Sequence, residues 1–96
     1  MIGLVAKLSI KPEKENQVAD ACKEMVKAVN EKETGCLFYE AFKPKDSLSE
    51  IWFLEKYTSM EALEEHRQAK HYLEFREKIK DYLAAAPEVT LLDQLQ

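Results

Sequence analysis

The chain is poor in glycine, proline, cysteine and histidine. Its 96 residues include two glycines, three prolines, two cysteines and two histidines, while 46% are hydrophobic and 33% are charged. This balance indicates an ordinary folded domain rather than a disordered chain. We therefore expect a single domain over residues 1–96, near the lower end of typical domain sizes.

The scarcity of cysteine excludes two kinds of site. Cys22 and Cys36 stand 14 residues apart, which fits neither a C-x-x-C redox pair nor a zinc knuckle. Cys22 falls in an apolar helical stripe and Cys36 at a strand start, so both are predicted to be buried free thiols. Free thiols are typical of a reducing compartment, and we expect a cytoplasmic location.

An excess of basic residues and a long hydrophobic run are missing too. Lys and Arg number 14 against 18 Asp and Glu, which gives a net charge of −4. A surface that reads nucleic acid needs clustered Lys and Arg, so we expect no nucleic-acid partner. No stretch approaches the length of a membrane span, and the first residues do not resemble a signal peptide. We therefore expect no membrane partner.

What the sequence does contain is a hydrophobic pattern that changes between the strand period and the helix period. The pattern predicts strands over 2–10, 36–42, 48–57 and 89–95, and helical regions over 13–31 and 58–83. A short polar turn joins the second and third strands, so an antiparallel hairpin is expected there. The order β-α-β-β-α-β predicts an α+β fold of the ferredoxin-like type.

Three local details can be predicted as well. Thr58, followed three residues later by Glu61, has the pattern of a capping box at a helix start. Gly35 follows the first helix and is a candidate for a turn with positive φ. The apolar stripes of the first and second parts of region 58–83 differ in direction by roughly 100°, which predicts a kink or break near 68–70.

Three motifs follow one another along the chain and carry a resemblance. They are Glu33-Thr34-Gly35-Cys36-x-x-Tyr39 after the first helix, Glu55-Lys56-Tyr57 at a strand end, and Ala62-x3-His66-x4-His71-Tyr72-x-x-Phe75 in the second helical region. Together, and over nearly the whole chain, they resemble the antibiotic biosynthesis monooxygenase (ABM) family. The resemblance implies a dimeric α+β barrel, in which two ferredoxin-like sheets pack face to face.

The resemblance also implies an activity. Quinol monooxygenases of this kind oxidise small phenolic or quinol-type substrates with O2, without metal or flavin, so we expect an oxidoreductase that needs no cofactor. Two alternatives stay open: an isomerase of a small oxygenated, autoinducer-type metabolite, and a dimer that binds a small ligand without turnover. Relatives that degrade haem use an Asn in the first strand. The first strand of this chain has no Asn, so haem degradation is disfavoured.

His66 is the predicted catalytic residue, since an imidazole can take a proton near neutral pH. The residues predicted to bind substrate are Phe53, Glu55, Tyr57, Tyr39 and His71. Each has a structural alternative. Tyr39 could simply fill the core, and Glu55 could form an ion pair with Arg67 or Arg76 or a hydrogen bond to a helix terminus. His66 and His71 would lie about 140° apart on an unbroken helix, so no metal site is expected from them.

The two faces of the third strand predict the assembly. Phe53, Glu55 and Tyr57 share one face, which we assign by analogy with the family to a cavity under the helices. Trp52 and Leu54 share the other face, which one layer of helices leaves bare. Left bare, this face would expose an apolar patch larger than the patches that soluble monomers usually expose. A second copy can cover it, so we expect a homodimer.

Overall fold

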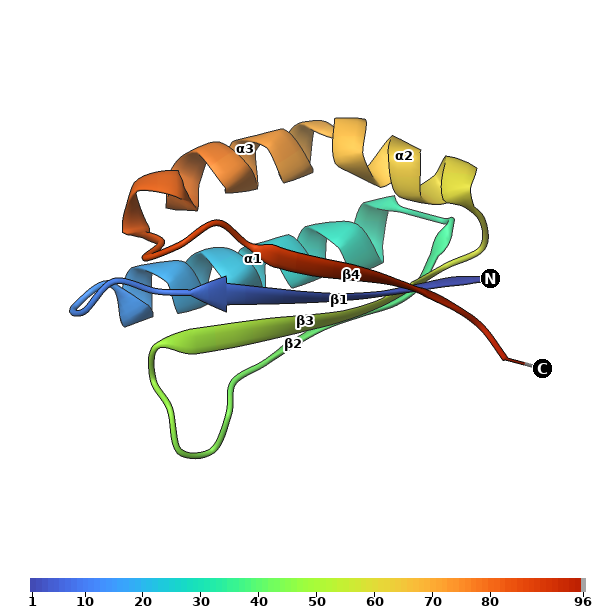
Figure 1. Cartoon of the computed structure of the whole chain (residues 1–96). Helices are drawn as coiled ribbons and strands as arrows, with labels where there is room; N and C mark the ends of the chain where they lie inside the picture. Colours follow the sequence, from blue (N-terminus) through green and yellow to red (C-terminus); the bar gives the residue numbers. More distant parts are fainter. Residues whose placement is uncertain (96) are drawn as a thin grey trace.

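One four-stranded sheet carries the helices on a single face (Figure 1). The computed structural model describes residues 1–95. The elements in chain order are β1 (Ile2–Ser9), α1 (Glu15–Lys32), β2 (Cys36–Phe42), β3 (Glu50–Tyr57), α2 (Met60–Gln68), α3 (Lys70–Ile79), the 3-10 helix η1 (Lys80–Tyr82) and β4 (Glu88–Asp93). The order of strands and helices confirms the predicted ferredoxin-like α+β fold.

The sheet has the strand order β2-β3-β1-β4, and every neighbouring pair is antiparallel. The predicted hairpin between β2 and β3 is therefore confirmed. Cross-strand partners share a face of a sheet, so the pairing of Leu4 with Glu55 and of Ala6 with Phe53 sets one continuous face. This face is buried under the helices.

Helix α1 packs on the sheet through one apolar stripe. Its buried residues recur every three or four positions: Val18, Ala21, Cys22, Met25 and Val29. The stripe matches the predicted one. The helix begins two residues later than predicted, because Glu13 adopts a left-handed backbone with φ 72° and cannot join the helix.

The second helical region is broken, as the change of stripe direction predicts. Helix α2 ends at Gln68 and α3 begins at Lys70, with Ala69 between them in an extended conformation, φ −67° and ψ 144°. The break lets Leu63 of α2 and Phe75 of α3 enter the same core. The predicted cap is displaced by one residue: Ser59, not Thr58, accepts the backbone N–H of Ala62 at 3.1 Å.

Gly35 has a different role from the predicted one. No glycine in the described chain has a positive φ. Instead, a Cβ built on Gly35 would lie 2.6 Å from the Cβ of Ala62 on α2, which is closer than real Cβ atoms approach. The Gly35 carbonyl also accepts the N–H of Thr58 at 2.9 Å. Gly35 therefore allows the start of β2 to pack directly against α2.

The opposite face of the sheet is apolar and exposed. Leu54 is 38% exposed, Leu92 46% and Phe42 51%. Among residues 1–95 no helix covers this face (Figure 1). The predicted division of β3 is confirmed, because Phe53, Glu55 and Tyr57 are buried and Leu54 is not. None of the helices described here has the length and apolar character to cross a membrane.

Gly35→Ala should lower the free energy of unfolding by about 1–3 kcal/mol, the usual cost of overpacking. Urea unfolding measures it. Ala62→Gly makes room for the added methyl, at a cost of about 1 kcal/mol for glycine inside a helix. The double variant should therefore be more stable than the sum of the two single losses predicts. Strict additivity would show that the contact with Ala62 does not restrict residue 35.

Candidate functional site

A cavity of about 890 Å3 lies between the helix-covered face of the sheet and helices α2 and α3. Its volume is in the range of pockets that hold small organic ligands. Apolar side chains line much of the cavity: Leu4, Ala6, Leu8, Phe53, Leu63, Phe75 and Ile79. Four of the six predicted site residues, Tyr39, Phe53, Glu55 and His66, also line it. Tyr57 and His71 do not belong to its lining.

Tyr57 lies behind the cavity wall and supports Glu55. The Tyr57 side chain is fully buried, and its hydroxyl donates a hydrogen bond to Oε1 of Glu55 at 2.6 Å. The partner of the buried carboxyl group is therefore a tyrosine, not Arg67 or Arg76. Burial of Glu55 raises its pKa to about 7, with a further rise from the charge of Glu33 and an opposing effect of the Tyr57 hydrogen bond. Near neutral pH this carboxyl group is present in both protonation states.

His66 sits in the last turn of α2 among aromatic rings. Its ring centroid lies 4.8 Å from that of Tyr72 and 5.4 Å from those of Tyr39 and Tyr57. Only 3% of the residue is exposed, so it is more buried than a position at the edge of a pocket would suggest. Burial lowers the pKa of His66, and this effect exceeds the opposing effect of the hydrogen bond that His66 donates to Glu33. The imidazole is therefore neutral near pH 7.

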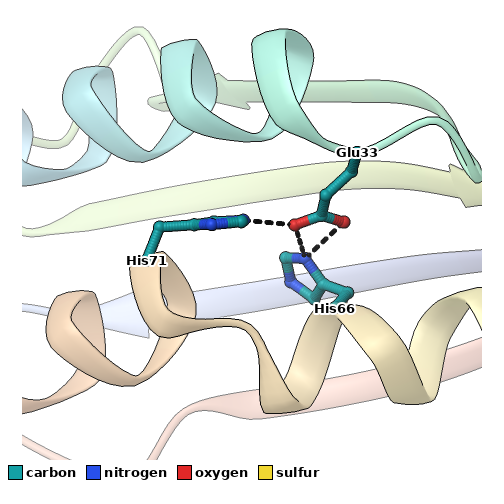
Figure 2. A group of neighbouring side chains, drawn as sticks. All are labelled: Glu33, His66 and His71. Atoms are coloured by element: carbon teal, nitrogen blue, oxygen red, sulfur yellow. Dashed lines mark hydrogen bonds and ion pairs between the residues drawn. The ribbon is translucent and has the colours of Figure 1, made fainter.

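Glu33 determines which nitrogen of His66 carries the proton. The two carboxylate oxygens of Glu33 lie 3.0 and 2.9 Å from Nδ1 of His66 (Figure 2). A carboxylate only accepts hydrogen bonds, so the neutral imidazole donates from Nδ1. Nε2 then keeps a lone pair. A buried histidine held in one tautomer on the wall of a cavity can accept a proton from a bound molecule.

His71, in the first turn of α3, contacts the same carboxylate. Its Nε2 lies 2.5 Å from Oε2 of Glu33. His71 also lines a smaller hollow of about 330 Å3 between α1 and α3. Figure 2 shows the two imidazoles approaching Glu33 from the end of α2 and the start of α3. The predicted separation of the histidines is wrong, because Ala69 interrupts the helix and changes the direction of everything after it.

Sequence reasoning includes Glu33 in the first motif of the resemblance but gives it no role in the site. It is the C-cap of α1, where the extended backbone, φ −107° and ψ 115°, turns its side chain away from the helix axis. The side chain is 12% exposed, although glutamate usually stays in water. One signal in the sequence could have found it: an acidic residue at the end of a helix, where negative charge is disfavoured, in a chain with only two histidines.

Comparison with known sequences gives a family and a relative. The family profile described as antibiotic biosynthesis monooxygenase matches residues 1–78. A protein of Mycobacterium tuberculosis, the candidate monooxygenase Rv0793, is 36% identical over 63 residues. This match covers 66% of the present chain and 61% of the relative, which is less than two thirds of the relative's length.

Comparison with solved structures extends over the whole fold. The solved structure of Rv0793 has a TM-score of 0.91 and 27% identity, covering 99% of this chain and 95% of that one. A candidate antibiotic biosynthesis monooxygenase from Caulobacter crescentus has a TM-score of 0.93 and 28% identity, covering 99% and 90%. Since the family profile also spans residues 1–78 of the 96, the chain belongs to the antibiotic biosynthesis monooxygenase family.

Proposed function

We propose that this protein is a cofactor-independent monooxygenase that oxidises a small phenolic or quinol-type substrate with O2. The observation that carries the proposal is His66, which lines an aromatic cavity while Glu33 holds its Nδ1. The family to which the chain belongs supports the reaction class. The substrate class is the one that the resemblance to quinol monooxygenases implies, and the largely apolar lining of the cavity is compatible with it.

The first step is removal of the phenolic proton by Nε2 of His66. The resulting phenolate is electron-rich and can transfer an electron to O2, so the substrate itself supplies every electron of the reaction. A ring C–H becomes a carbonyl, one oxygen atom enters the product, and the other leaves as water. A phenol and O2 thus give a quinone and water, and no external reductant is needed.

The cavity suits a phenolate in two further ways. Burial raises the pKa of Tyr39, so its hydroxyl stays protonated and can donate a hydrogen bond to a substrate oxygen. The Tyr39 and Phe53 rings, with centroids 5.2 Å apart, offer faces for an aromatic ring. In an environment of low polarity, the attraction between a phenolate and an imidazolium is stronger than in water.

An isomerase of a small oxygenated metabolite is the second candidate. Glu55 and His66 line the same cavity, and the Glu55 pKa of about 7 makes it a fitting proton donor beside a histidine base. Such an enzyme would convert its substrate without O2. Oxygen uptake during turnover therefore separates the two reactions. A bound ligand that is never converted would instead indicate the non-catalytic class.

We also propose that the protein is a homodimer joined through the exposed face of the sheet. The central position on this face is Leu54, which pairs with Val5 of β1 and Glu40 of β2. Phe38 and Phe42 extend the apolar area along β2. A second copy, related by a two-fold axis, presents the same apolar surface and would remove both from water.

His66→Gln should reduce turnover of an authentic quinol-type substrate by about 10²–10⁴-fold, the usual effect of removing a general base. Glutamine can still donate to Glu33 but does not accept a proton near neutral pH. His71→Gln is the matched control: it makes the same change at the other histidine on Glu33 and should cost much less. Steady-state kinetics, with circular dichroism to verify the fold, measure both. Near wild-type turnover by His66→Gln would remove His66 from the mechanism.

Glu55→Gln should stabilise the protein relative to wild type as pH rises. The Glu55 pKa is raised from 4.5 to about 7 in the folded state, so the folded protein retains a proton that the unfolded chain loses. Wild-type stability therefore falls through this window, by on the order of 3 kcal/mol. Glutamine does not titrate, so its advantage should grow between pH 4.5 and 7 and then level off. Urea unfolding across that range measures it, and an unchanging difference would contradict the raised pKa.

Leu54→Lys should dissociate the proposed dimer, because it places a charge at the centre of the apolar sheet face. Leu73→Lys makes the same change on α3, in the helical layer, and should leave the assembly intact. Sedimentation at micromolar concentration should give the mass of two 11.1 kDa chains for wild type and Leu73→Lys, and of one for Leu54→Lys. A wild-type mass of one chain would refute this assembly.

A further inference from the structure

Three side chains, of which only His66 lines the substrate cavity, converge on one point. Nδ1 of His66, Nε2 of His71 and a carboxylate oxygen of Glu33 all lie within 4.8 Å of one another. The three residues come from the end of α1, the last turn of α2 and the first turn of α3 (Figure 2). The point therefore lies where the three helices meet.

These atoms are a chemically suitable ligand set for a metal ion. Two imidazole nitrogens and one carboxylate oxygen, with no thiolate, fit divalent ions of the zinc class, whereas Mg²⁺ and Ca²⁺ prefer oxygen ligands. Zinc–ligand bonds of about 2.0–2.2 Å place neighbouring donor atoms of a tetrahedral site roughly 3.3 Å apart. The nitrogen–oxygen contacts of 2.5–3.0 Å reach that spacing through shifts of less than about 1 Å. The two ring nitrogens, which lie within 4.8 Å of each other, reach it by approaching each other by up to about 1.5 Å.

The surroundings of Glu33 also favour a bound cation. The Glu33 carboxylate is 12% exposed and sits at the C-terminal end of α1, where the helix dipole disfavours negative charge. The C-terminal end of α2 lies beside the same point and also disfavours negative charge there, whereas the N-terminal end of α3 favours it. A divalent ion held between the two imidazoles and the Glu33 carboxylate would compensate the negative charge of that carboxylate.

We propose that Glu33, His66 and His71 bind one divalent ion of the zinc class per chain, with an open fourth position. The sequence argues against this site only on the assumption of an unbroken helix, and the break at Ala69 removes that assumption.

Metal binding would switch off the general base, a consequence that rests on the proposed function. In the metal-free protein, His66 donates from Nδ1 to Glu33 and accepts protons at Nε2. When a metal occupies Nδ1, the neutral ring carries its proton on Nε2 and has no lone pair left for a substrate. The oxygenation itself uses no metal, so the site is inhibitory: Zn²⁺ should suppress turnover and a chelator should restore it.

Titration of the chelator-treated full-length protein with Co²⁺ tests the site without any substrate. Visible ligand-field absorption should saturate at one Co²⁺ per chain, and added Zn²⁺ should displace it. Loss of a residue that only hydrogen-bonds to a metal ligand typically weakens metal binding about 10–100-fold. Glu33→Gln and His71→Gln remove a ligand itself, so each should weaken Co²⁺ binding by more than that. Glu31→Gln, which removes an exposed charge two positions from Glu33, should bind as wild type does.

Cys36→Ser serves as the second control, because Cys36 is a half-buried free thiol near the cluster. It should retain wild-type affinity. Binding that does not saturate at one ion, that survives Glu33→Gln, or that disappears in Cys36→Ser would overturn the metal site. For inhibition, His71→Gln should raise the Zn²⁺ concentration needed to halve turnover by the same factor as it weakens Co²⁺ binding. One-to-one binding that leaves turnover unchanged supports the site and refutes Nε2 of His66 as the base.

Discussion

The position of one carboxylate governs the arrangement of the helical layer. Glu33 closes α1, accepts a hydrogen bond from the last turn of α2 and contacts the first turn of α3. The apolar core can hold each helix against the sheet, but it is not directional. The Glu33 contacts are directional, and they fix the rotation of His66 about its own side-chain bonds. The geometry of the cavity wall therefore depends on a residue that the cavity does not contain.

Burial acts in opposite senses on the two titratable groups in the cavity. It raises the pKa of Glu55 and lowers that of His66, because in both cases the charged form loses its hydration. Each group is thereby moved toward its uncharged form near neutral pH. When Glu55 is protonated and His66 is neutral, the cavity can admit a neutral aromatic molecule without the desolvation cost of a buried ion. Charge then develops only when a proton moves.

The sequence predicts the sheet and the position of the helix break well. Both follow from the spacing of hydrophobic residues, which is a local property of each strand or helix. The assignment of Phe53, Glu55 and Tyr57 to the helix side is confirmed for the same reason. The roles of Gly35 and Glu33 could not be predicted in this way. Gly35 is required by the approach of Ala62, and Glu33 is turned inward by two histidines more than 30 positions away. Both are consequences of tertiary packing, which local patterns do not contain.

The extended residue Ala69 separates α2 from α3. Before it, the cap at Ser59 fixes the start of α2, the helix that carries His66. After it, α3 starts in a direction that the junction sets, and His71 in its first turn contacts Glu33. On one unbroken helix the two histidines would point about 140° apart. The conformation of a single residue, and not the identity of any side chain in the cavity, thus brings both imidazoles to the same carboxylate.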